Sequence, residues 1–255
     1  MRAAGGDAPD GYERLALRDV EAVVMHDCAA ALASVLRAGT LYAYAAAHPT
    51  RRELAGRAAA YAVPLGGRAV VVRHSRHGGL LAPLTGDRFL PPTRAPGELR
   101  TALRLARAGV PTPPVVATVV YAAGPLLRTA DVATGEVAGA RDLSAALAAP
   151  DSQARAVALA ATATLLRRLA DAGARHPDLN LKNVLVAADG DGGVVAHVID
   201  VDRVTFERPS SDAARRANVR RLGRSIEKWR DRLAPGAADE ALTQLSAALA
   251  VTVAA

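Results

Sequence analysis

The chain has 255 residues, of which 51% are hydrophobic and 22% are charged, and its formal net charge is +7. This composition is typical of a globular protein with a substantial core, and it excludes a largely disordered chain. The single cysteine, Cys28, excludes an intramolecular disulfide framework and a cysteine-rich zinc site.

The positive charge comes almost entirely from arginine, because Lys182 and Lys228 are the only lysines among 32 basic residues. We interpret this excess first as a mutational bias of the genome and second as function. Neither lysine follows a glycine-rich turn, which excludes a P-loop. An isoelectric point of about 10.3 favours an acidic partner. With 3% aromatic residues and no evident stacking platform, we expect no nucleic-acid partner.

No segment resembles a membrane span or an export signal. The longest strongly apolar run, Ala156–Leu166, is too short to cross a bilayer. Acidic residues occur near the N-terminus where a signal peptide would be apolar. The expected location is therefore the cytoplasm, with a peripheral position on the inner membrane left open.

Short strands dominate the predicted elements of the first half. A strand and turn are expected over 12–25, and Gly66-Gly67 favours a hairpin between two strands. Asp27 is a candidate N-cap for the first helix. In chain order the remaining elements are a helix over 29–36 ending at Gly39, strands near 58–63 and 68–72, a long loop, a helix over 98–108 ending at Gly109, and strands over 115–121 and 126–133.

The second half is mostly helical, with one polar β-hairpin inside it. A helix over 154–172 ends at Gly173, two strands flank the turn Asp189–Gly193, and a helical tail begins near Ala213. This order predicts a two-lobed α+β fold. The expected divisions are an N-terminal extension over 1–48, a strand-rich lobe over 49–133 and a helical lobe over 134–255.

The densest group of polar residues surrounds that hairpin. Asn183 precedes its first strand and Asp200 closes its second, so their oxygens should converge at one end of the hairpin. Such oxygens suit Mg²⁺ together with substrate phosphates. Asp178 lies on the same loop, close enough to act on a hydroxyl near the metal.

The segment His176–Asn183 matches the kinase catalytic loop H-x-D-L-x-x-x-N, and a metal-binding aspartate follows it. The alternative is a polar loop whose Asp and Asn side chains cap turns. Asp200 is followed by Val201-Asp202 and not by Phe-Gly, which favours a small-molecule kinase over a eukaryotic protein kinase.

Kinase chemistry would also require nucleotide-binding residues in the first half. Arg73 ends a Val-rich strand where kinases carry a lysine, and Glu98 begins the next helix as its natural partner. A surface arginine and an acid that complements the helix dipole are the alternatives. Gly56 marks a weak glycine-rich loop over the phosphates. Thr129 to Val132, near the end of the fourth strand, is the expected adenine-binding hinge.

From about Gly56 to Lys228 the chain resembles the lipopolysaccharide kinases, and among them the kinases of 3-deoxy-D-manno-octulosonic acid (Kdo), an acidic sugar on lipid A. The motifs that carry the resemblance are Val72-Arg73-His74, Arg76–Leu80, Gly86–Leu90, Glu98-Leu99-Arg100, Gly109–Pro113, His176–Asn180, Asn183, Ile199–Arg203 and Asn218–Lys228.

The resemblance implies a protein-kinase-like fold and phosphoryl transfer from ATP to the 4-hydroxyl of Kdo. It makes Asp178 the catalytic base, Asn183 and Asp200 the Mg²⁺ ligands, and Arg73 and Glu98 the nucleotide-positioning pair. Leu181-Lys182 and Ser75 depart from the family pattern and put the acceptor in doubt. Arg76, His77 and Arg88 form a basic segment that could bind the acidic sugar or simply be a solvated loop.

The C-terminal helix carries an apolar stripe at helical spacing among many arginines. Its members are Val219, Leu222, Ile226, Trp229 and Leu233. Packing of this stripe on the helical lobe is favoured over contact with an anionic membrane. Two other functions stay open: a kinase for a different core sugar, an antibiotic or a protein, and a catalytically inactive kinase-like binding module.

Overall fold

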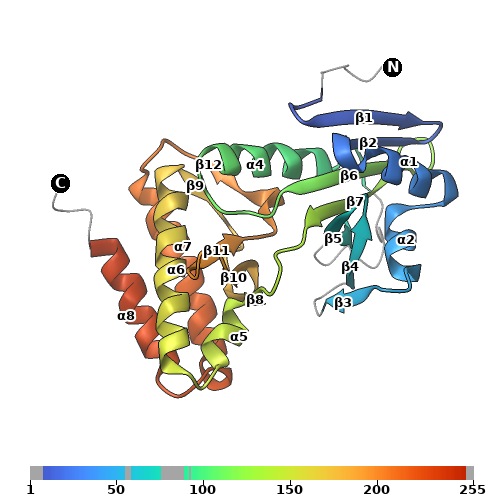
Figure 1. The fold of residues 1–255 in the computed structure, drawn as a ribbon. Coiled ribbons are helices and arrows are strands. Elements are labelled where there is room, and N and C mark those ends of the chain that lie inside the picture. Colours follow the sequence, from blue (N-terminus) through green and yellow to red (C-terminus); the bar gives the residue numbers. More distant parts are fainter. Residues whose placement is uncertain (1–7, 55–58, 76–88, 92, 251–255) are drawn as a thin grey trace. The chain divides into compact units, whose positions relative to one another are not determined.

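The computed structural model describes residues 8–54, 59–75, 89–91 and 93–250. The chain divides into two compact units. Figure 1 shows the fold, coloured along the sequence from the N-terminus in blue to the C-terminus in red. Unit 1 comprises Met1–Arg100 and Pro114–Glu136, and unit 2 comprises Thr101–Pro113 and Val137–Ala255. The expected division near residue 133 is close to the observed passage from unit 1 to unit 2 at Glu136.

Unit 1 is built on an antiparallel sheet with the strand order β1-β2-β6-β7-β5-β4-β3. The predicted hairpin forms around Gly66-Gly67, where both glycines have positive φ angles. The predicted strands of this half are confirmed, and β3 is added to them. The strands are β1 (Tyr12–Leu17), β2 (Val20–Met25), β3 (Arg52–Leu54), β4 (Ala60–Leu65), β5 (Arg68–His74), β6 (Val115–Ala122) and β7 (Arg128–Gly135).

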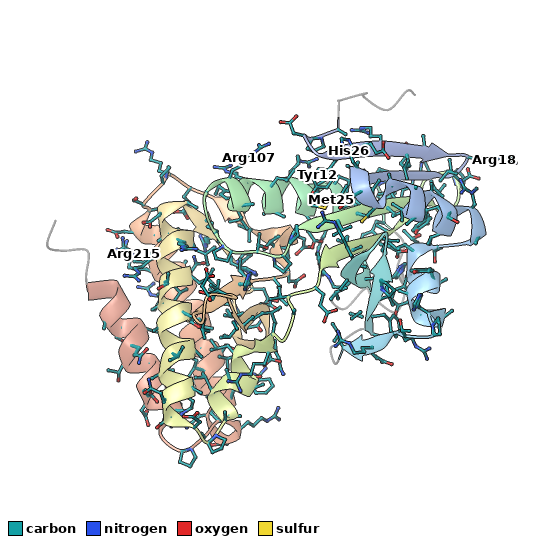
Figure 2. The ribbon with its side chains drawn as sticks, in the orientation of Figure 1. Tyr12, Arg18, Met25, His26, Arg107 and Arg215 are labelled. Atoms are coloured by element: carbon teal, nitrogen blue, oxygen red, sulfur yellow. The ribbon has the colours of Figure 1, made fainter. Side chains whose placement is uncertain are left out.

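Residues 1–48 are not a separate extension, in contrast to the prediction. Strands β1 and β2 form a hairpin, and β2 pairs with β6 of the same sheet. The hydroxyl of Tyr12 is buried and donates to the carbonyl of Val115 at 2.7 Å. Figure 2 shows Tyr12, Met25 and His26 at one end of this hairpin and Arg18 at the other. Hydrogen bonds and burial therefore make this segment part of unit 1.

Two helices supply the apolar cover of the unit 1 core. The 3₁₀ turn η1 (His26–Cys28) leads into α1 (Ala29–Ala38), and α2 (Leu41–Ala47) follows. Leu32 of α1 and Leu41 of α2 are fully buried in one cluster with Val70, Val72 and other strand side chains. The side chain of Thr40 caps α2 by accepting from the backbone N–H of Ala43 at 3.0 Å.

Asp27 does not cap α1, so that prediction is wrong. The N-cap position is Cys28, which makes no side-chain capping hydrogen bond, because η1 moves the start of the helix past Asp27. Asp27 instead pairs with Arg68 of β5 at 2.6 Å. Hydrogen bonding from Arg68 lowers the pKa of the Asp27 carboxyl below its usual value.

The helix α4 (Ala95–Arg107) confirms the predicted helix before Gly109, where φ is +70°. Its first residues belong to unit 1 and its last to unit 2. In unit 2, the guanidinium of Arg104 lies 3.7 Å from the ring centroid of Phe206, a cation–π contact.

Unit 2 is mainly helical and contains the predicted polar hairpin. Strand β10 pairs with β11 and with β8, and β9 pairs with β12. The helices are α5 (Leu143–Ala148), α6 (Ser152–Asp171), α7 (Asp212–Trp229) and α8 (Ala237–Ala250). The strands are β8 (Arg141–Asp142), β9 (Ala174–Arg175), β10 (Val184–Ala188), β11 (Val194–Val198) and β12 (Thr205–Phe206). The α+β class, with a strand-rich and a helical unit, is confirmed.

The apolar stripe of α7 packs inside unit 2, as predicted. Val219, Leu222 and Ile226 are buried where α7 contacts α6 and α8. Among the described residues no single helix is long and apolar enough to cross a membrane. The bent pair His26–Ala38 and Leu41–Ala47 meets that test by length and composition alone, and its leucines Leu32 and Leu41 are buried in unit 1.

Candidate active site

The catalytic loop begins where α6 ends and is held in place from its first residue. Gly173 ends the helix with φ +65°, and a Cβ there would lie 2.5 Å from the carbonyl oxygen of Arg208. Only glycine fits this approach, because other residues would clash as well as strain the backbone. Strand β9 follows and leads directly to His176.

His176 connects the catalytic loop to the segment that carries Asp200. Its Nε2 lies 3.1 Å from the carbonyl oxygen of Ile199, and the backbone N–H of Asp178 donates to its Nδ1 at 3.3 Å. Burial lowers the pKa of the imidazole below its usual value. Because Nδ1 accepts from Asp178, Nε2 is the nitrogen that donates to Ile199, and the ring joins the catalytic loop to the segment that carries Asp200.

The hairpin brings Asn183 and Asp200 to the same end, as its geometry predicts. Val184 pairs with Val198, and the backbone N–H of Ile199 donates to the carbonyl of Asn183 at 3.0 Å. Asp200 follows with φ +61° and ψ +49°, a left-handed conformation that is uncommon for residues other than glycine. The backbone therefore turns at Asp200, just after the end of β11.

These residues have the donor chemistry that Mg²⁺ requires. The side-chain amide of Asn183 donates through Nδ2 to the carbonyl of Asp178 at 2.9 Å, which leaves its Oδ1 as the atom for a cation. Asp200 supplies a carboxylate. Hard oxygen donors from one or two side chains, completed by water and phosphate, are the usual Mg²⁺ environment.

Asp178 is half-buried, and its backbone is fixed by the loop. Its carbonyl accepts from Asn183 Nδ2 and from Asn180 Nδ2, both at 2.9 Å. Its carboxylate Oδ1 accepts from Arg221 Nη2 at 2.6 Å. In the described part of the chain Oδ2 has no donor, so one oxygen of the carboxylate is available to a substrate hydroxyl.

Helix α7 clamps the catalytic loop with three polar side chains that sequence analysis missed. Asn218 is fully buried, accepts from the N–H of His176 at 2.9 Å and donates to the carbonyl of Ala174 at 2.8 Å. Arg221 Nε donates to the carbonyl of Pro177 at 3.0 Å. Ser225 Oγ accepts from the N–H of Leu181 at 3.2 Å. Their spacing of three and four residues beside the apolar stripe was the available signal.

In unit 1 the structure brings together the predicted pair of Arg73 and Glu98. Arg73 Nη2 on β5 donates to Glu98 Oε1 on α4. Glu98 is 5% exposed, whereas the side chain of Arg73 is 34% exposed. A partly exposed guanidinium fixed by a buried carboxylate is suited to bind phosphate. Its role toward ATP stays a prediction.

A buried network beside Arg73 was not predicted. Asp131 on β7 is fully buried and accepts from the hydroxyl of Tyr121 and the N–H of Tyr42, both at 2.9 Å. His74 Nδ1 lies 2.6 Å from the second carboxylate oxygen. These bonds link α2, β5, β6 and β7, and they fix the strand residue that follows Arg73.

The predicted hinge residues lie inside β7 and not at its end, and their contact with adenine stays a prediction. Thr129 and Val132 lie inside β7, where Val132 pairs with Arg73 on one side and Thr118 on the other. The strand continues to Gly135 because Val71 and Val70 extend the pairing. The chain passes to unit 2 after Glu136. Gly56, Arg76, His77 and Arg88 lie outside the described residues.

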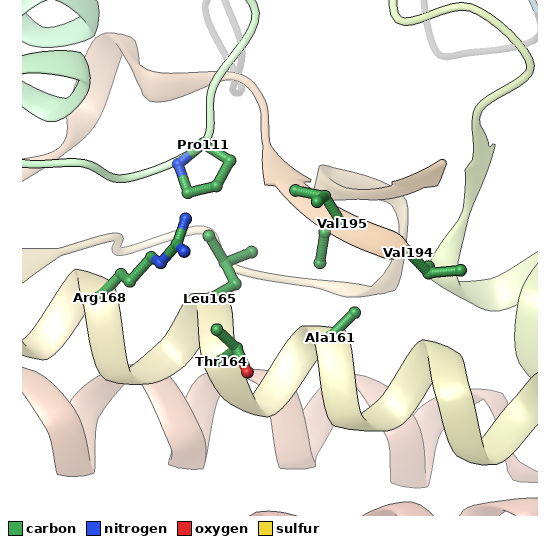
Figure 3. Close-up of a pocket in the computed structure, with 8 residues that line it drawn as sticks. Pro111, Ala161, Thr164, Leu165, Arg168, Val194 and Val195 are labelled. Carbon is green, nitrogen blue, oxygen red and sulfur yellow. The ribbon is translucent and has the colours of Figure 1, made fainter. Parts of the chain in front are cut away.

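Unit 2 also forms a small pocket that contains none of the predicted site residues. Its volume is about 140 Å³, and Pro111, Leu165, Arg168 and Val195 are among the residues that line it. Figure 3 shows Leu165 and Arg168 on the helix beneath Pro111 and Val195. Arg168 Nη1 donates to the carbonyl of Gly109 at 3.3 Å. We assign this pocket no role in phosphoryl transfer.

Replacing Arg73 with methionine is expected to raise the KM for ATP by about 10- to 100-fold, because a charge-assisted hydrogen bond contributes about 1.5–3 kcal/mol. Arg73→Lys keeps the charge and should recover part of the affinity. The measurement is steady-state kinetics at varied ATP, with thermal unfolding as the control for folding. An unchanged KM for ATP in Arg73→Met would contradict the assignment.

Comparison with known proteins shows which proteins this chain is similar to. The chain is 31% identical over 177 residues to the 3-deoxy-D-manno-octulosonic acid kinase of Vibrio cholerae serotype O1, which covers 68% of this chain and 72% of that protein. It is 32% identical over 180 residues to the enzyme of the same name from Stenotrophomonas maltophilia, and the match covers 69% of this chain and 68% of that protein. Among solved structures, WaaP in complex with acyl carrier protein matches with a TM-score of 0.49 and 18% identity, over 86% of this chain and 92% of that one.

A family model described as the lipopolysaccharide kinase (Kdo/WaaP) family matches residues 46–246. This range includes Arg73, Glu98, the whole catalytic loop and α7. Because the model spans most of the chain, and the kinase motifs lie on the elements that position them, the chain is a phosphotransferase with a kinase-like fold that belongs to the lipopolysaccharide kinase (Kdo/WaaP) family.

Proposed function

We propose that this chain transfers the γ-phosphoryl group of ATP to the 4-hydroxyl of Kdo on lipid A. The observation that carries the proposal is the assembled loop of unit 2, in which Asp178, Asn183 and Asp200 are fixed by the hairpin and by α7. The two relatives described above bear the name of this activity. The net charge of +7 suits an acidic acceptor.

Asp178 is the group that handles the acceptor proton. Its Oδ2 accepts a hydrogen bond from the sugar hydroxyl, while Arg221 holds Oδ1. The hydroxyl oxygen forms a bond to the γ-phosphorus as the bond to the bridging oxygen of ADP breaks, and the proton passes to Asp178. Positioning by an aspartate of this kind is the general pattern in kinases.

Arg73, fixed by Glu98, supplies positive charge to the ATP phosphates. Asn183 and Asp200 would hold Mg²⁺, which when bound neutralises negative charge on the phosphates. Catalysis in this class of reaction depends mostly on such positioning and electrostatic stabilisation.

The acceptor chemistry also determines where the protein would work. Lipid A is a membrane lipid, so we propose that the protein acts from the cytoplasm at the surface of the inner membrane. The net charge of +7 supports contact with an anionic surface. The apolar stripe of α7 would not contact the membrane, because Leu222 and Ile226 are buried in unit 2.

The test is an acceptor panel with Mg-ATP, followed by release of ADP. Kdo–lipid A is expected to stimulate ADP release above the rate without acceptor, whereas lipid A lacking Kdo is not. Stimulation by another core sugar, an antibiotic or a protein in place of Kdo–lipid A would select a different kinase. Failure to bind or consume Mg-ATP would select an inactive kinase-like module.

A further inference from the structure

One face of α7 carries four cations and no acid. We call Arg220, Arg221, Arg224 and Lys228 the cationic strip. Successive residues of an α-helix are rotated by about 100°, so these four side chains fall within a sector of about 100°, which they share with Ala213 and Ala217. Arg220, Arg224 and Lys228 are exposed, and the side chain of Arg221 is 33% exposed.

The cationic strip begins at the catalytic base. Arg221 contacts both the carboxylate of Asp178 at 2.6 Å and the carbonyl of Pro177 at 3.0 Å. The neighbouring row of the same helix, Asn218 and Ser225, holds the catalytic loop. From Arg221 the strip continues to Lys228, about 10 Å along the helix axis. An anion bound to the strip would therefore lie beside Asp178.

The arginines near the start of α7 are paired with a carboxylate, unlike most of the cationic strip. Arg215 and Arg216 lie 3.5 and 4.0 Å from carboxylate oxygens of Asp212. Arg230, after the helix, pairs with Glu227 at 2.9 Å. Its other partner is Asp239 at 2.8 Å.

For Arg220, Arg224 and Lys228, by contrast, the described residues include no carboxylate within salt-bridge distance. Like charges four residues apart destabilise a helix by about 0.2–0.5 kcal/mol per pair. Arg220, Arg224 and Lys228 form two such pairs. Glu227, the acid nearest to the strip in sequence, is already engaged by Arg230. The arrangement costs stability in the free protein, and a bound anion would remove that cost.

We propose that the cationic strip is the acceptor-binding surface of this kinase. Arg221 would contact the sugar carboxylate next to Asp178, and Arg220, Arg224 and Lys228 would bind the phosphate groups of the glycolipid. Guanidinium groups form paired hydrogen bonds with carboxylate and phosphate oxygens, which fixes orientation as well as affinity. The proposal rests on the proposed function, and it names the surface that selects a polyanionic acceptor.

The kinetic test compares Arg224→Ala, Lys228→Ala and the double variant with Arg167→Ala. Arg167 is an exposed arginine of α6, outside the cationic strip, so it controls for loss of one surface arginine. Each strip variant should raise the KM for Kdo–lipid A about tenfold and the double variant about 100-fold, since a charged contact contributes about 1.4 kcal/mol or more. The KM for ATP, the kcat and the melting temperature should stay close to wild type. A KM for the acceptor that does not change in the double variant would overturn the proposal.

A binding test without nucleotide separates this proposal from the proposed function. The full chain is mixed with phosphatidylethanolamine vesicles that contain either Kdo–lipid A or an equal charge of phosphatidylglycerol, and co-sedimentation is measured. Stronger binding of the Kdo–lipid A vesicles, lost in the double variant and kept in Arg167→Ala, supports the strip even if the wild type transfers no phosphate. If the double variant loses binding to both kinds of vesicle equally, the strip is a general anionic membrane surface, and the acceptor assignment is overturned.

Discussion

Replacing Asp178 with asparagine is expected to lower kcat for phosphoryl transfer by about 10³-fold, within the range measured for loss of a general base. Asparagine keeps the size of the side chain and can still contact Arg221, but it cannot accept the proton of the attacking hydroxyl. The expected KM for ATP is close to wild type, because Asp178 is assigned to the acceptor. Initial rates of ADP release at varied ATP and acceptor give both quantities.

The same variant should fold normally. The side chain of Asp178 is 46% exposed and its ion pair with Arg221 is partly exposed, so the free energy of unfolding should change by less than about 1 kcal/mol. Asp189→Asn, in the turn of the hairpin, is the matched control for loss of one carboxylate and should keep full activity. Wild-type rates in Asp178→Asn would remove Asp178 from the mechanism.

Replacing Asn218 with alanine is expected to lower the free energy of unfolding by about 2–4 kcal/mol, because two buried backbone groups lose their partners. These groups are the N–H of His176 and the carbonyl of Ala174, and Asn218 itself is fully buried. Because the loop then loses its anchor to α7, kcat should fall by about tenfold or more. Urea denaturation and steady-state kinetics measure the two effects.

Ser225→Ala provides the comparison for Asn218. Ser225 makes one hydrogen bond to the same loop, at 3.2 Å, so its loss should cost about 1 kcal/mol and change kcat less. Asn218→Asp keeps an acceptor for His176 but loses the donor for Ala174 and buries a carboxylate, so it should destabilise the fold at least as much as Asn218→Ala. Equal stability of Asn218→Ala and wild type would contradict the clamp.

The parts of the site that could be predicted from sequence are those fixed by local chain order. Asn183 and Asp200 flank one tight hairpin, so antiparallel pairing alone brings their backbones together. The helix before Gly173 and the strands around Gly66-Gly67 follow from periodicity and turn residues. The partner of Arg73 could be predicted because Glu98 occupies the position that kinases use.

The parts that sequence missed depend on contacts between distant segments. Asn218 and Arg221 act on residues more than forty positions earlier in the chain, and neither shows its partner in the helical pattern. The same holds for Tyr12 and Val115, which join β1 and β2 to the sheet. Asp27 was misassigned because the 3₁₀ turn η1 moves the start of α1 past it, which the sequence pattern did not show, and its side chain pairs with the distant Arg68.

The arginines differ in whether the fold gives them an anionic partner. Arg73 and Arg221 each contact a carboxylate of the proposed machinery, and Arg215, Arg216 and Arg230 pair with acids on the surface. Within the cationic strip, Arg220, Arg224 and Lys228 have no carboxylate within salt-bridge distance among the described residues. Mutational bias accounts for the number of arginines, whereas the fold decides which of them have anionic partners within the chain and which face solvent.

The most direct test of the central claim is the intact mass of Kdo–lipid A after incubation with the full chain and Mg-ATP, with fragmentation to locate any new group. The predicted result is the addition of one phosphate on the Kdo residue, with none when Asp178→Asn replaces the wild type. An unchanged acceptor mass with active, ATP-binding protein, or a phosphate located on the lipid A sugars, would contradict the account.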